Sequence, residues 1–102
     1  MIWVPNQLIG ASLGSNVTLE CNSDGYPEPI NYWLRHESEM IFNGGKYDVI
    51  FNVATYKFNM VLTIHNVVYN DYGRYRCFAE NALGITEGTI RLYGKHSVLF
   101  LI

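Results

Sequence analysis

The chain has 102 residues, the length of one ordinary domain, with 49% hydrophobic and 16% charged residues, a composition that excludes a disordered segment. The formal net charge is −2 with no basic stripe, which argues against nucleic-acid binding, and no apolar run is long enough to cross a membrane. Aromatic residues reach 15% and include eight tyrosines, which suit half-buried pleated surfaces and favour a β-rich domain.

Several segments alternate apolar and polar residues with a period of two, which indicates strands with one buried face: residues 17–21, 58–64, 75–79 and 90–92. Glycine, asparagine and proline punctuate the chain between them, at residues 14–16, 24–29, 43–45, 70–73 and 81–84. Short strands separated by such turns predict an all-β sandwich or barrel.

The two cysteines, Cys21 and Cys77, lack the C-x-x-C spacing of zinc and thioredoxin sites. They fit one long-range disulfide, which would stabilise the domain by about 4 kcal/mol in the chain-entropy model and would need an oxidising compartment. The alternative is two separate buried thiols in a cytosolic protein.

The most informative pattern surrounds the second cysteine, where residues 71–77 read D-x-G-x-Y-x-C. Trp33 stands twelve residues after the first cysteine, placed to fill the space beside an inter-sheet disulfide. Tyr75 would pack inward while its hydroxyl returns to the backbone near Asp71, and Gly73 would relieve the backbone at that corner. We also expect Asp71 to pair with Lys46 as a structural clamp.

These residues resemble the immunoglobulin superfamily over about residues 2–93, which implies an immunoglobulin-like antiparallel β-sandwich with one inter-sheet disulfide. The turn at residues 81–84 resembles the N-x-x-G turn of intermediate-set (I-set) domains, and the short spacing from Trp33 to Phe58 leaves little room for the extra strands of variable domains. The resemblance implies nine strands, with Pro5 dividing the first one. We therefore expect an I-set domain at residues 1–93 and a separate tail at 94–102.

The opening residues 1–11, the segment 29–33 and Lys46-Tyr47 resemble the third immunoglobulin domain of the Dpr-interacting proteins, which are close to the lachesin and IgLON adhesion proteins. That resemblance implies an extracellular, neuronal cell-surface location and partners that are themselves cell-surface immunoglobulin proteins. It also implies a membrane-proximal spacer role, with attachment to the membrane only through an anchor of the parent chain. The runner-up interpretation is an intracellular I-set domain of a muscle filament protein.

The buried set follows from strand alternation in this fold, with Trp33, Leu62 and Tyr75 at its centre. The remaining members are Val17, Leu19, Cys21, Phe58, Met60, Ile64, Cys77, Ala79, Ile90 and Leu92. The strands that contain Trp33 and Cys77 are expected to lie in one sheet. On its outward side we expect an exposed apolar cluster of Tyr32, Leu34 and Phe78, rimmed by Arg35, Arg76 and Glu80. Such a patch is a candidate partner contact, and scattered surface apolarity is the alternative.

Other chemistry is weakly signalled. Asn16 begins the one N-x-[ST] sequon and is a candidate glycosylation site. His36, His65 and His96 share no metal-ligand spacing, and no G-x-S-x-G motif or phosphate-binding loop occurs, so we expect no enzyme activity, cofactor, metal or small-molecule substrate.

The two ends carry further expectations. Residues 1–5 do not resemble a signal peptide, so we expect an excised domain or a parent chain that starts further upstream. Residues 98–102 are purely apolar, and they are either a stray end or the start of a longer hydrophobic anchor region.

Overall fold

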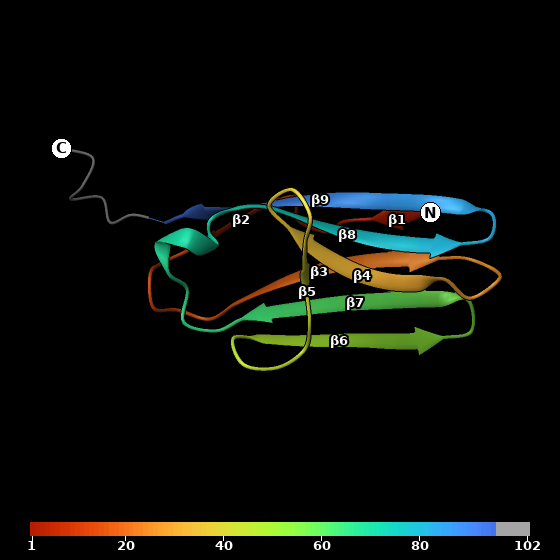
Figure 1. The fold of residues 1–102 in the computed structure, drawn as a ribbon, viewed down its shortest axis with the longest axis horizontal. Coiled ribbons are helices and arrows are strands. Elements are labelled where there is room, and N and C mark those ends of the chain that lie inside the picture. The colour runs from red at the N-terminus through yellow and green to blue at the C-terminus, as the bar shows by residue number, and fades with distance from the viewer. Residues whose placement is uncertain (96–102) are drawn as a thin grey trace.

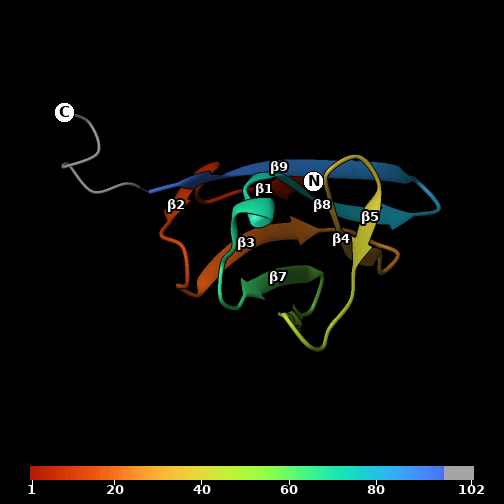
Figure 2. The ribbon, with the colours of Figure 1, turned by 60° about the vertical axis from the view of Figure 1, so that its left-hand side comes forward.

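Two facing sheets make up the fold in a computed structural model, which describes residues 1–95 (Figures 1 and 2). One sheet has the strand order β1 (Ile2–Trp3), β3 (Val17–Asp24), β7 (Lys57–Ile64) and β6 (Tyr47–Ala54). The other has the order β2 (Leu8–Ala11), β9 (Gly84–Gly94), β8 (Gly73–Asn81), β4 (Ile30–Arg35) and β5 (Glu39–Ile41). A short 3-10 helix, η1 (Tyr69–Asp71), precedes β8. Within these residues no helix is long and apolar enough to cross a bilayer.

The first strand is divided between the two sheets, as expected from Pro5. β1 pairs antiparallel with β3, and β2 then pairs parallel with β9, with Leu8 opposite Arg91. The chain changes sheets at Pro5 without reversing direction, which is why β2 runs alongside β9 in the same sense. The prediction of an all-β immunoglobulin-like sandwich is confirmed, and one parallel pair joins its otherwise antiparallel ladders.

The core lies between the sheets, on the inward faces that strand alternation predicts. Cys21 of β3 and Cys77 of β8 form a disulfide that joins the two sheets, with their Cα atoms 6.6 Å apart. Trp33 lies opposite Cys77 in the ladder and is fully buried, as is Leu62, and Tyr75 is buried as well. Of the residues expected inside, all are buried except Val17, which is half-buried at the start of β3.

One close approach was not anticipated from the sequence. Gly88 of β9 lies opposite Cys77, and a Cβ added there would stand 2.7 Å from a methyl carbon of Val4 and 2.9 Å from one of Ile2. Only a residue without a side chain lets the N-terminal segment pack this tightly over the disulfide. Gly88 therefore fixes how the first residues of the chain close over the core.

Candidate recognition face and its supporting network

A tyrosine corner fixes the start of β8. The Tyr75 hydroxyl donates a 2.6 Å hydrogen bond to the backbone carbonyl of Asp71, four residues upstream, as the D-x-G-x-Y-x-C pattern predicts. Gly73 between them has a φ of 137°, which favours glycine. Burial is the main reason that the pKa of the Tyr75 hydroxyl is raised, so the hydroxyl remains a donor at physiological pH.

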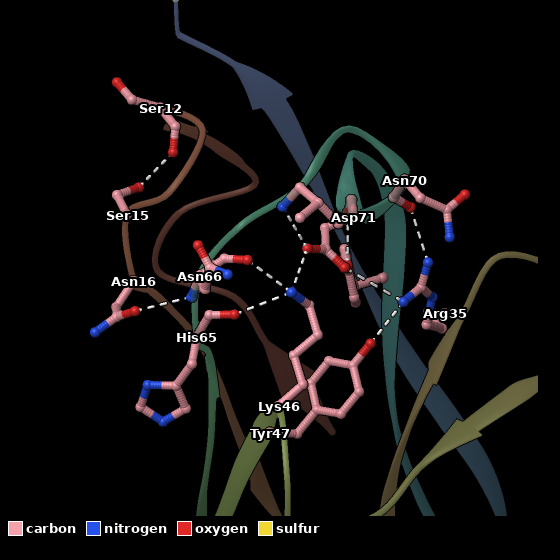
Figure 3. A network of polar contacts seen from close by, with 12 residues as sticks. Ser12, Ser15, Asn16, Arg35, Lys46, Tyr47, His65, Asn66, Asn70 and Asp71 are labelled. Carbon is pink, nitrogen blue, oxygen red and sulfur yellow. Dashed lines mark hydrogen bonds and ion pairs between the residues drawn. The ribbon is translucent and has the colours of Figure 1, made fainter.

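The Asp71 side chain lies at the centre of a buried polar network, shown in Figure 3. Its carboxylate lies 2.9 Å from Lys46 Nζ, the expected clamp, and it accepts a 2.8 Å hydrogen bond from the Val68 backbone N–H. Lys46 Nζ also donates to the backbone carbonyls of His65 and Asn66. The network thus ties the start of β6 to the segment between β7 and β8.

Arg35 is the second cation of this network, and its predicted place on the rim of an exposed patch is wrong. It is 5% exposed, 3.5 Å from the Asp71 carboxylate, and it donates to the Tyr47 hydroxyl and to the Asn70 carbonyl. Burial alone would lower the pKa of Arg35, but the hydrogen bond to Tyr47 and the neighbouring acidic groups outweigh it and raise the pKa. Arg35 points inward because it follows Trp33 by two positions in the same strand.

The outer face of β4 and β8 holds the residues proposed as a partner contact, but its central aromatic residue is covered. Phe78 stacks on Tyr32 with ring centroids 5.0 Å apart, and the Arg76 guanidinium lies 5.2 Å from the centre of the Phe78 ring. Phe78 is consequently 9% exposed. The prediction that Phe78 is an exposed member of the cluster is therefore wrong, although its side chain does belong to the outer face.

Several polar side chains at the centre of this outer face pair with neighbouring groups, although Arg76 Nε has no hydrogen-bond partner. The Tyr32 hydroxyl donates to a Glu80 carboxylate oxygen at 3.1 Å, while Arg76 pairs with Glu87 at 3.4 Å and donates to the Glu37 carbonyl. Burial is the first cause, and the Glu80 carboxylate the second, of the raised pKa of Tyr32. The centre is thus a preorganised, mixed-charge surface.

Apolar side chains remain accessible at the two ends of the outer face. Leu34 is half-buried and lies opposite Met40 of β5, which is 44% exposed. Ile30 of β4 and Ile85 of β9 are more than half exposed at the other end. These residues, together with Tyr32 and the covered Phe78, define the outer face below. Of the three residues expected to make contact, the structure leaves Leu34 and Tyr32 partly accessible.

Asn16 lies in the turn that leads into β3 and is exposed. Its side-chain oxygen accepts a 2.9 Å hydrogen bond from the Asn66 backbone N–H, and Figure 3 shows the amide nitrogen pointing away from that contact. The nitrogen to which a glycan would be attached is therefore directed outward.

The two histidines in the described part of the chain, His36 and His65, contact different residues. His36 contacts Arg35, and His65 Nε2 lies 2.6 Å from an Asp48 carboxylate oxygen. His96 lies outside the described residues, as do the apolar residues 98–102. Within residues 1–95, no three histidine, cysteine, aspartate or glutamate side chains gather in a way that could hold a metal ion.

The fold, the inter-sheet disulfide and the tyrosine corner define an immunoglobulin domain, and the family pattern described as "Immunoglobulin domain" matches residues 1–81. The chain belongs to the immunoglobulin family. Its I-set character and its resemblance to neuronal adhesion proteins, both expected from the sequence, are confirmed.

Three relatives illustrate the resemblance. The chain is 32% identical over 83 residues to neuronal growth regulator 1 of Gallus gallus and 40% identical over 84 residues to neural cell adhesion molecule 1 of Rattus norvegicus, with about four-fifths of the chain covered in both. A chain in the crystal structure of Dpr2 Ig1-Ig2 in complex with DIP-Theta Ig1-Ig3 superposes with a TM-score of 0.89 and 46% identity over 93% of this chain. By name, the relatives include a neuronal growth regulator and a neural cell adhesion molecule.

The same comparisons also reach muscle proteins. The chain is 36% identical over 91 residues to the titin homolog of Caenorhabditis elegans, which covers 88% of this chain. All these relatives are much longer than the chain, which spans 22% of neuronal growth regulator 1, 9% of the neural cell adhesion molecule and 32% of the matched chain in the crystal structure.

Proposed function

We propose that this chain is an extracellular domain of a neuronal cell-surface adhesion or recognition protein. The similarity to the chain from the Dpr2–DIP-Theta complex, at 46% identity, is the observation that carries the proposal, since it exceeds the likeness to the muscle proteins. The inter-sheet disulfide suits an oxidising compartment, and the exposed sequon at Asn16 suits a glycoprotein.

Within such a protein the domain acts as a stiff spacer near the membrane. It covers 32% of the matched chain, the share that one domain of three would have. The disulfide and the Asp71 network brace the sandwich at its centre and at one end. The parent chain supplies any membrane anchor, and the domain expected at residues 1–93 extends by one residue, because β9 ends at Gly94. The mechanism is noncovalent throughout and uses no cofactor or catalytic residue.

A side contact to another immunoglobulin-superfamily protein would use the outer face of β4 and β8. It combines accessible apolar side chains at its two ends with Tyr32, Phe78 and Arg76 at its centre, and aromatic residues and arginine are enriched at interfaces. Leu34 lies at one of the two accessible ends, beside Met40, so a charge introduced there would oppose a partner.

The test is binding of the secreted, oxidised chain to an array of neuronal surface ectodomains. We expect Leu34→Glu to abolish a partner's binding while the domain stays folded, because the side chain is only half-buried and its neighbour Arg76 can accommodate a carboxylate. Phe78→Glu is unsuitable for this purpose, because it would break the ring stack and add a charge beside Glu80 and Glu87.

The matched control is Thr63→Glu, which adds the same charge to the outer surface of the opposite sheet. Equal loss of binding in both variants would contradict a contact through the outer face. If the folded domain bound no partner, the proposed side contact would be contradicted and the spacer role would remain.

A second candidate function is a structural domain of a muscle filament protein, favoured by the 36% identity to the titin homolog. Such a domain would work in a reducing compartment, where Cys21 and Cys77 would be thiols. The redox state of these two residues in native material therefore separates the two functions.

A further inference from the structure

The free edge of β6 (Tyr47–Ala54) is a second surface with the character of an interface. β6 is the outermost strand of its sheet, and Figure 1 shows no strand beyond it. Exposed edges are usually blocked by lysine, proline or several charges. β6 has neither lysine nor proline, and Asp48 is its single charged residue.

The backbone groups that β6 directs to its free edge are hydrogen-bonded in the first half of the strand and unpaired in the second half. The Lys46 carbonyl accepts from the His65 N–H, so the even-numbered residues of β6 bond to β7 and the odd-numbered ones direct their backbone groups to the free edge. Tyr47 is bonded to Gly44, and the Val49 N–H donates to the Asn43 side chain at 2.8 Å. Within residues 1–95 no contact caps the edge from the Val49 carbonyl to the Val53 carbonyl.

Apolar side chains lie on both faces of the sheet along this open segment, with Asn52 as its one polar residue. Ile50 faces outward and is 50% exposed. Phe51 and Val53 face the core side, but they lie at the edge and remain 42% and 57% exposed. An open strand edge flanked by such residues is a template for strand pairing.

We propose that this edge pairs with the same edge of a second copy of the chain, antiparallel about a two-fold axis at Phe51. In this register Phe51 lies opposite Phe51 of the partner subunit, and Val53 lies opposite Val49 of the partner subunit. The N–H groups of Phe51 and Val53 and the carbonyls of Phe51 and Val49, which are all free in one copy, then form intermolecular hydrogen bonds. Because the two-fold pairing uses each open edge once, the assembly closes as a dimer.

Charge complementarity indicates that the partner at this edge is a second copy of the chain. In the proposed register Asp48 of the partner subunit lies opposite Ala54, and Lys57 flanks Ala54 on its other side in the β6–β7 ladder. All three lie on the solvent-facing side of the sheet that contains β6 and β7, so Lys57 reaches over the small Ala54 to the partner's Asp48, about 10 Å away between backbones. The two-fold axis forms this ion pair twice. Within one chain Asp48 and Lys57 are about 20 Å apart along the sheet, so they do not contact each other, and Asp48 contacts His65 instead.

This dimer does not use the outer face of β4 and β8, and it goes beyond the proposed function. The experiment is sedimentation velocity of the oxidised chain over a wide range of concentrations. We expect a concentration-dependent dimer. Val53→Pro, which removes an N–H from the free edge and none from the β7 ladder, should raise the dimer dissociation constant at least about tenfold.

Lys57→Glu should weaken the dimer, and the swap Lys57→Glu with Asp48→Lys should restore it, because the two residues meet only between copies. Arg91→Glu is the matched control, since it makes the same charge change at an exposed site of the other sheet and should leave the dimer unchanged. Thermal melts show whether Val53→Pro is folded, and Lys57→Glu, at an exposed site, carries the test if it is not.

A monomer at every concentration would overturn the proposal. So would a dimer that survives both Val53→Pro and Lys57→Glu, or one that the charge swap fails to restore. A dimer that persists in these variants but is lost when residues 96–102 are removed would assign the association to the tail instead.

Discussion

Replacing Trp33 by alanine is expected to lower the free energy of unfolding by about 3–5 kcal/mol, since large aromatic truncations in a core have costs of this size. Trp33 is fully buried opposite Cys77, where its indole fills the space beside the disulfide. A domain's whole stability is about 5–15 kcal/mol, so the variant should melt far below the parent chain. Denaturant titration of the oxidised proteins measures the difference.

The other tryptophan provides the control. Trp3 on β1 is 41% exposed, so Trp3→Ala removes the same side chain from a site that water already reaches and should have a much smaller effect. If the two variants were equally stable, Trp33 would not be the centre of the core and the sandwich described above would be contradicted.

Replacing Asp71 by asparagine is expected to destabilise the domain by about 3 kcal/mol, the lower end of the range for removing one partner of a buried ion pair. The substitution keeps the shape of the side chain but removes the buried carboxylate 3.5 Å from Arg35, which is 5% exposed and keeps only the solvated Glu39 carboxylate at 3.8 Å. Lys46 loses its 2.9 Å partner too, although its side chain is partly solvated. Thermal and denaturant unfolding of the variant measure the loss.

Glu87→Gln is the matched control for Asp71→Asn, because it neutralises one carboxylate of the surface pair with Arg76. Exposed pairs contribute about 0–1 kcal/mol, so this control should unfold almost as the parent chain does. Similar stabilities of the two variants would mean that the Asp71 network does not brace the end of the sandwich.

The residues that sequence reasoning placed well are those whose position is fixed by local pattern. The alternation around Cys21, Cys77 and Tyr75 predicted their inward faces, and the motif spacing predicted the hydrogen bond from Tyr75 to Asp71. The ion pair between Lys46 and Asp71 also follows the prediction. The inward faces and the tyrosine hydrogen bond depend on a strand period or a motif spacing that the sequence displays directly, whereas the ion pair joins residues from distant parts of the chain.

The residues that it misplaced depend on neighbours from distant parts of the chain. Arg35 is predicted on the rim of the exposed cluster, although its alternation with Trp33 puts it inside, where its guanidinium contacts Asp71 and Tyr47. Phe78 faces the predicted side, but its cover comes from Tyr32 on the neighbouring strand. The need for glycine at 88 arises from the N-terminal segment that crosses over it. A single strand's pattern contains none of these contacts.

The state of Cys21, Cys77 and Asn16 in the native protein tests the assignment to the cell surface most directly. Mass spectrometry after alkylation of free thiols, on protein purified from the tissue that expresses it, reads all three residues in one experiment. The account predicts that Cys21 and Cys77 are joined and that Asn16 carries a glycan. Two alkylated cysteines with an unmodified Asn16 would contradict it and would assign the domain to a reducing compartment, as in a muscle filament protein.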